Sequence, residues 1–76
     1  MGADMNKRQA NKLCAALNGV IHSRNLYRNG RRLYNAQVCV TDCRIEIRVE
    51  DLYSGNQSEF VNDGSFVDGY GQPVIL

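Results

Sequence analysis

Long apolar runs are missing from this 76-residue chain, and a membrane-spanning helix needs about 20 consecutive apolar residues. The N-terminal residues also lack the apolar stretch of a secretory signal. We therefore expect a cytoplasmic protein with no membrane partner. Met5 follows closely on Met1, so either residue is the native start, and in the second case residues 1–4 are a cloning remnant.

Cysteine and histidine are scarce: the chain holds Cys14, Cys39, Cys43 and His22. Small secreted scaffolds carry an even number of cysteines, so an odd set favours reduced thiols. No two cysteines have the two-residue separation of a zinc knuckle. We expect Cys14 and Cys43 to be small core hydrophobes and Cys39 to be an exposed thiol.

Catalytic and nucleotide-binding motifs are lacking as well. The glycines follow neither phosphate-loop nor dinucleotide-binding spacing. Cys14 and His22 lie on one predicted helix, about 12 Å apart along its axis, which is too far for a catalytic dyad. The helix dipole alone explains a histidine near a helix C-terminus. The sequence therefore predicts no enzyme, no cofactor and no metal site.

Charge is present but unevenly distributed. Residues 1–34 hold seven Lys and Arg and one Asp, a net +6, whereas residues 35–76 hold two Arg and seven Asp and Glu, a net −5. The total of +1 hides this division. An uneven charge distribution governs partners and association rates rather than the fold.

Residues 5–22 are predicted to form an amphipathic helix, because apolar residues recur at spacings of three and four. This apolar stripe comprises Ala10, Leu13, Cys14, Leu17, Val20 and Ile21. Polar residues, Asn18 among them, occupy much of the remaining helix surface.

Two hairpins are expected after the helix. The dipeptide Asn29-Gly30 favours a two-residue turn, although this turn sets Arg28 opposite Arg31, and a plain basic loop is the alternative. Further on, residues 44–50 alternate strictly between apolar and charged, and we pair them with residues 34–40.

A two-residue turn at Thr41-Asp42 gives the second hairpin a register that puts every apolar partner on one face. The predicted pairs are Val40 with Cys43, Val38 with Ile45, Ala36 with Ile47 and Tyr34 with Val49.

A turn at residues 54–56 precedes a predicted third strand over residues 57–61, and residues 64–76 form a Gly-rich segment with an apolar end. We expect that end to dock on this core or on another subunit. The sequence thus predicts one α+β domain over residues 1–76. An N-terminal amphipathic helix packs on an antiparallel sheet of three to four strands, and the outer sheet face is left for water or a partner.

Arginines interleaved with tyrosines between residues 24 and 34 make the strongest candidate for partner binding. Arginine binds phosphates and carboxylates, and tyrosine stacks on bases or anchors protein interfaces. Acidic residues of the second half offer a negative face that mimics nucleic-acid phosphates. The predicted partner-binding residues are Arg24, Tyr27, Arg28, Arg31, Arg32, Tyr34, Glu46 and Glu50.

In size, layout and lack of catalytic motifs, the chain resembles small phage-encoded accessory proteins such as anti-CRISPR inhibitors. This resemblance implies a protein partner that handles nucleic acid in a bacterial cytoplasm. The order of one helix and three strands is also similar in part to double-stranded RNA-binding domains, but their C-terminal helix is missing. We therefore expect a protein-interaction module that inhibits or regulates its partner. Direct nucleic-acid binding through Arg24–Arg32 is the alternative, and homodimerisation is compatible with either.

Overall fold

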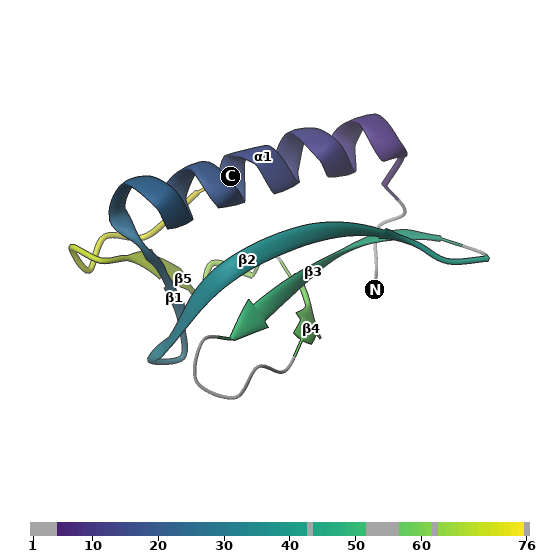
Figure 1. Ribbon diagram of the computed structural model, residues 1–76. Helices are drawn as coiled ribbons and strands as arrows, with labels where there is room; N and C mark the ends of the chain where they lie inside the picture. Colours follow the sequence, from purple (N-terminus) through teal and green to yellow (C-terminus); the bar gives the residue numbers. More distant parts are fainter. Residues whose placement is uncertain (1–4, 43, 52–56, 62, 76) are drawn as a thin grey trace.

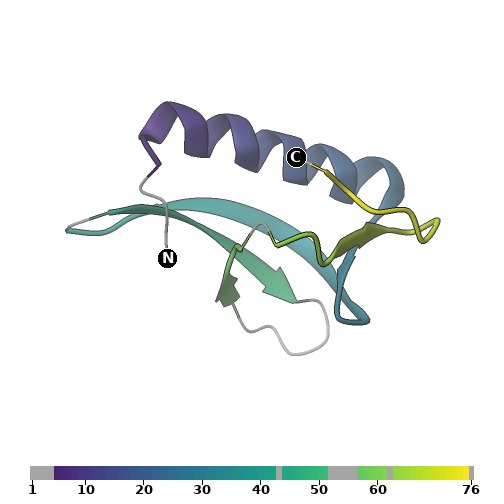
Figure 2. The same cartoon turned by 180° about the vertical axis from the view of Figure 1, so that it is seen from behind.

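The computed structural model describes residues 5–42, 44–51, 57–61 and 63–75. Its elements are α1 (Lys7–Arg24), β1 (Leu26–Arg28), β2 (Arg31–Val40), β3 (Ile45–Asp51), β4 (Gln57–Glu59) and β5 (Phe66–Asp68). The strands form one antiparallel sheet in the order β4-β3-β2-β1-β5. Helix α1 lies across one face of this sheet (Figure 1 and Figure 2). The predicted α+β class and layout are confirmed, with five strands rather than three to four.

Helix α1 begins at an unpredicted capping box formed by Asn6 and Gln9. The Asn6 side chain accepts a hydrogen bond from the Gln9 N–H at 2.8 Å, and the Gln9 side chain accepts one from the Asn6 N–H at 3.2 Å. The helix therefore starts two residues later than predicted, and it ends at Arg24. The predicted apolar stripe is confirmed: Ala10, Cys14, Leu17 and Val20 are buried, and Leu13 and Ile21 are half-buried.

The first predicted hairpin is confirmed as β1 and β2, and the basic-loop alternative is wrong. Asn29 and Gly30 have φ angles of 53° and 76°, so both adopt the left-handed conformation of a type I′ turn. Arg28 then sits opposite Arg31, as the turn requires. These two like charges each have an acidic neighbour, described below, which offsets their repulsion.

The second hairpin forms, but its predicted register is wrong by two residues. Val38 pairs with Ile47 and Ala36 with Val49, because the loop has four residues rather than two. The Arg44 carbonyl closes this loop by accepting hydrogen bonds from the Thr41 N–H at 2.9 Å and the Thr41 hydroxyl at 3.0 Å. A slip of two residues keeps each side chain on its face, so the apolar pattern could not reveal it. Cys43 lies outside the described residues.

A β-bulge between Leu33 and Asn35 corrects the predicted inner face of β2. The bulge inserts one extra residue and shifts the alternation, so Leu33 and Ala36 are both buried against the helix. Tyr34, predicted to face inward, is instead 41% exposed. Val40, also predicted inward, is 65% exposed near the hairpin tip.

The third predicted strand exists as β4 and is shorter than expected. Phe60 follows it and turns into the core, where its ring stacks on Phe66 with a centroid separation of 5.1 Å. The unpredicted strand is β5, which lies within the Gly-rich segment and contributes the fully buried Phe66. The predicted turn at residues 54–56 lies outside the described residues.

The apolar C-terminal segment docks on this core, which was one of the two expected outcomes. The Val74 N–H donates to the Phe66 carbonyl at 3.0 Å, and the Val74 side chain is buried. Ile75 beside it is 92% exposed. Residue 76 lies outside the described residues.

Asn18 ties α1 to the backbone of β2. Its side-chain amide donates to the Ala36 carbonyl at 2.9 Å, and its side-chain oxygen accepts from the Ala36 N–H at 3.1 Å. The Cys14 thiol donates to the same carbonyl at 3.1 Å. One asparagine side chain thus takes the place that a neighbouring strand would occupy.

We expect Asn18→Ala to lower the free energy of unfolding by about 1–3 kcal/mol more than Asn11→Ala, because it leaves two backbone groups unpaired. Both substitutions replace asparagine with alanine in the same helix, so their gains in helix propensity match. Urea denaturation of the two variants measures the difference. Equal stabilities would show that water replaces the Asn18 amide without cost.

Candidate interaction surface

Two arginines of the predicted basic segment pair with aspartates from the acidic half of the chain. Arg24, at the end of α1, lies 3.2 Å from the Asp68 carboxylate. The Asp68 side chain is only 1% exposed and also accepts hydrogen bonds from the Tyr70 and Gln72 N–H groups. Arg31, at the start of β2, lies 3.2 Å from the Asp51 carboxylate at the end of β3.

Arg28 is held by an aromatic ring as well as by a carboxylate. Its guanidinium lies over the Phe66 ring, 5.2 Å from the centroid, because Arg28 and Phe66 are direct partners of β1 and β5. Asp63 lies 3.8 Å from the same guanidinium. Hydrogen bonds from Ser65, more than the charge of Arg28, hold the pKa of Asp63 below its ordinary value.

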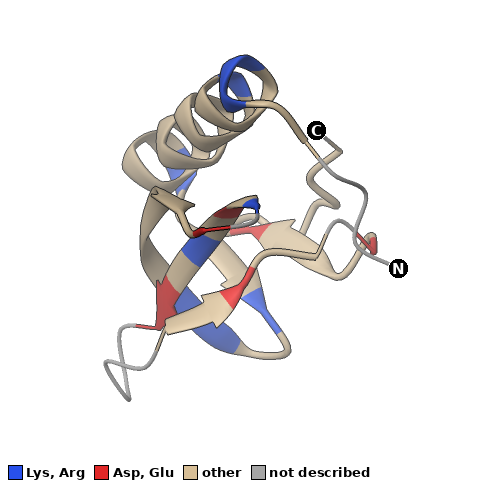
Figure 3. Cartoon of the chain, turned by 90° about the vertical axis from the view of Figure 1, so that its right-hand side faces the viewer, with Lys and Arg blue, Asp and Glu red and all other residues tan. Residues whose placement is uncertain are grey.

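The charge division of the sequence is therefore largely compensated within the fold. Figure 3 shows basic and acidic stretches side by side on the strands rather than at opposite poles. Lys7, Arg8 and Lys12 form no ion pair with any described residue. The uncompensated positive charge of the described region thus lies mainly on the N-terminal half of α1, whose cations are not among the eight predicted partner-binding residues.

Tyr27 and Arg32 occupy the face of the sheet that α1 leaves open. They sit opposite each other on β1 and β2, and their neighbours Leu26 and Leu33 point into the core. Arg32 donates to the Asn25 side chain at 2.9 Å, and its guanidinium has no carboxylate partner among the described residues.

Tyr34 joins this group because the β-bulge turns it toward Glu50. A hydrogen bond to the Glu50 carboxylate is the largest cause that raises the pKa of the Tyr34 phenol above its ordinary value. Asn35, the next residue, is the direct cross-strand partner of Glu50. We call Tyr27, Arg32, Tyr34 and Glu50 the open-face cluster.

Glu46 lies on the same face, but its carboxylate already forms ion pairs with Arg44 and Arg48. Arg48 donates to one of its carboxylate oxygens through Nε at 2.8 Å and Nη2 at 2.6 Å. Arg44 lies 3.0 Å from the other oxygen and also pairs with Glu59. The Glu46 side chain is only 9% exposed, so a partner could reach it only by displacing these arginines.

The structure thus divides the eight predicted residues into three groups. Four form the open-face cluster, and Glu46 is enclosed between two arginines on the same face. Arg24, Arg28 and Arg31 are committed to aspartates elsewhere. Sequence reasoning could not find these pairings, because the partners are 20 to 44 residues apart along the chain.

Cys14 and Cys39 differ in burial, and Cys43 lies outside the described residues. Cys14 is buried in the core, as predicted, and burial raises the pKa of its thiol. Cys39 is half-buried on β2, and His22 is exposed in the last turn of α1. Within the described part of the chain, no three His, Cys, Asp or Glu side chains are placed to hold a metal ion.

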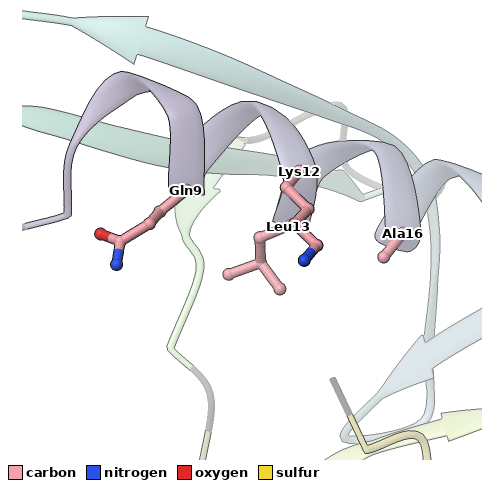
Figure 4. A pocket seen from close by; sticks show the side chains of 4 residues that line it. All are labelled: Gln9, Lys12, Leu13 and Ala16. Atoms are coloured by element: carbon pink, nitrogen blue, oxygen red, sulfur yellow. The ribbon is translucent and has the colours of Figure 1, made fainter.

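A shallow hollow of about 240 Å³ lies along α1 and is lined by Gln9, Lys12, Leu13 and Ala16 (Figure 4). Its walls are mainly apolar. These residues lie on the side of the helix away from Asn18, because each residue advances by about 100°. Across the described residues, no helix has the length and apolarity of a membrane span.

Comparison of the chain with protein-family models, with curated proteins and with solved structures finds no match.

The pairing of Glu46 predicts an acid-dependent loss of stability. The Arg48 hydrogen bonds, followed by the charges of Arg48 and Arg44, lower the pKa of Glu46 below its ordinary value of 4.5. A carboxyl whose pKa is lower in the folded state stabilises the fold above its ordinary pKa. That contribution is lost as the pH falls through the lowered value.

We therefore expect an NMR titration of the Glu46 carboxyl to have a midpoint below 4.5 in the wild type. The midpoint should be higher in Arg48→Met, which removes the main cause. Arg8→Met, on the far layer of the molecule, is the control and should leave the Glu46 midpoint unchanged. An unperturbed wild-type midpoint would show that the guanidinium pairing is not maintained in solution.

Proposed function

We propose that this protein is a small, non-enzymatic interaction module that acts in the cytoplasm as an inhibitor or regulator of a partner protein. In our proposal the open-face cluster contacts that partner, and the partner is a protein that itself handles nucleic acid. The proposal agrees with the resemblance to phage-encoded accessory inhibitors, which remains one of size and layout.

The position of the open-face cluster is the observation that carries this proposal. Tyr27, Arg32 and Tyr34 are adjacent on the sheet face that α1 leaves open. Tyrosine and arginine are enriched among the residues that dominate protein interfaces. They lie on strands rather than on a loop, so little conformational entropy is lost when a partner binds. The flanking ion pairs of Glu46 further restrain this face.

The alternative, direct nucleic-acid binding through Arg24–Arg32, is favoured by one observation: the Arg32 guanidinium has no carboxylate partner among the described residues. The other three arginines of that segment would have to leave Asp68, Asp63 and Asp51 to contact phosphates. Exchanging an aspartate carboxylate for a nucleic-acid phosphate adds little binding free energy, so we rank this alternative second. Binding through phosphates would also weaken steeply as salt is raised.

A capture experiment from a bacterial lysate tests the proposal, with the immobilised protein, with and without nuclease, at low and moderate salt. We expect a protein partner that persists through nuclease and salt. The double variant Arg32→Ala/Tyr34→Ala should reduce its recovery at least about tenfold, because both residues lie in the cluster.

Lys12→Ala is the matched control, since it removes an exposed cation from the side of α1 that faces away from Asn18 and should leave recovery unchanged. Circular dichroism checks that each variant remains folded. Recovery of nucleic acid that is lost on raising the salt would overturn the proposal in favour of the alternative. Equal recovery by the double variant and the control would exclude the open-face cluster as the contact.

A further inference from the structure

The alternation of hydrogen-bonded and non-hydrogen-bonded pairs along β2 and β3 shows which backbone groups of β2 point away from β3. In an antiparallel pair, opposed residues either bond to each other or both point outward. Ile47, the partner of Val38, accepts from the Phe60 N–H at 2.8 Å on the β4 side, so Val38 must point to the opposite side of the ribbon. Ala36, two residues earlier, confirms this, because its N–H and carbonyl bond to Asn18.

The backbone groups of Val40, two residues after Val38, also point away from β3. Strand β1 is too short to pair with Val38 or Val40. β1 pairs only with Arg31–Leu33 of β2, and Asn18 takes the groups of Ala36. Among the described residues, no strand pairs with this side of β2 beyond Leu33. Val38 and Val40 therefore present the N–H and carbonyl groups of an open sheet edge.

This edge lacks the usual protection against strand addition. Natural sheets protect their edges with charged residues, prolines, bulges or very short strands. Residues 34–41 contain no charged residue and no proline, and the bulge at Tyr34 lies before the Val38–Val40 part of the strand. Val40 is moreover 65% exposed on the helix side of the strand.

The charges beside the edge indicate what binds there. Lys7, Asn11 and Asn18 share one side of α1, because steps of about 100° bring these positions together. Asn18 reaches the β2 edge, and α1 runs antiparallel to β2 (Figure 1), so the Lys7 end of this side lies toward the Val38–Val40 end of β2. Lys7 and Arg8 have no carboxylate partner among the described residues and add positive charge to this end.

We propose that the Val38–Val40 edge of β2 binds an extended, acidic segment of a partner protein by strand addition. Backbone hydrogen bonds to Val38 and Val40 hold the segment, and its aliphatic side chains pack beside these valines. Acidic side chains on the same face of the segment approach the cations of α1. This edge is separate from the open-face cluster, so neither site depends on the other.

A second copy of the chain fits this edge less well than a single extended segment. α1 packs across β2, and Asn18 brings it to the edge itself. Two copies paired through β2 would place their helices over strands about 4.8 Å apart, whereas packed helices need about 8–10 Å. Their basic helix ends would also repel each other.

The probe for this site is a fluorescent peptide, blocked at both ends, with the sequence Glu-Thr-Val-Thr-Val-Thr-Glu. Its valines and glutamates share one face, as the proposal requires. We expect it to bind at least about tenfold more tightly than the same peptide with lysine in place of glutamate. Fluorescence anisotropy with the full chain measures both affinities.

Two N-methylated versions of the acidic peptide form a matched pair of probes, and this comparison needs no change in the protein. Methyl groups on the two valine nitrogens block the groups that face Val38 and Val40 and should reduce affinity at least about tenfold. Methyl groups on the two flanking threonine nitrogens should have little effect. Equal affinities for the two methylated peptides, or no binding of the acidic peptide, would overturn the proposal.

Two protein variants complete the test. Val38→Pro removes an N–H that points outward, so the fold should persist and the peptide should no longer bind. Arg32→Ala/Tyr34→Ala should bind the peptide like the wild type, which distinguishes this edge from the open-face cluster. A dimer in sedimentation that Val38→Pro dissociates would instead identify a second copy as the occupant and overturn the acidic-segment assignment.

Discussion

The two hydrogen bonds between the Asn18 side chain and the Ala36 backbone are the interaction on which the arrangement of this domain depends. The apolar stripe of α1 explains why the helix binds the sheet, but hydrophobic burial is not directional and does not set its position along β2. The asparagine sets that position. It holds the helix at the β2 edge, satisfies one residue of that edge, and leaves the rest of the edge and the opposite face of the sheet open.

Charge compensation is the second constraint. The type I′ turn places Arg28 and Arg31 opposite each other. The fold offsets this by bringing Asp63, which precedes β5, to Arg28 and Asp51, at the end of β3, to Arg31. In the sequence, this arginine-rich segment resembles a phosphate-binding site. In the fold, three of its arginines form ion pairs with aspartates of the same chain. The positive charge that remains uncompensated lies mainly on the first half of α1, where Lys7 and Arg8 are at the helix end toward the open β2 edge.

The two proposed contact surfaces have different chemistry, because they belong to different parts of the sheet. The open-face cluster presents side chains, namely tyrosines and an arginine, on rigid strands. The β2 edge presents backbone groups, and in our proposal the neighbouring cations select an acidic segment for it. A chain of 76 residues with a small core can support both, since a strand offers its face and its edge independently.

By itself the sequence determined the elements whose signals are local: the helix stripe from Ala10 to Ile21, the Asn29-Gly30 turn, and the alternation of residues 44–50. The tertiary structure alone decided the register of β2 against β3, because a slip of two residues leaves every side chain on its face. It also decided the outward turn of Tyr34, since one inserted residue in the bulge shifts the alternation. The pairing of Arg24 with Asp68 and the capture of Ala36 by Asn18 likewise join residues distant in the chain. Local patterns carry no information about such contacts, because they arise only when the strands and the helix pack together.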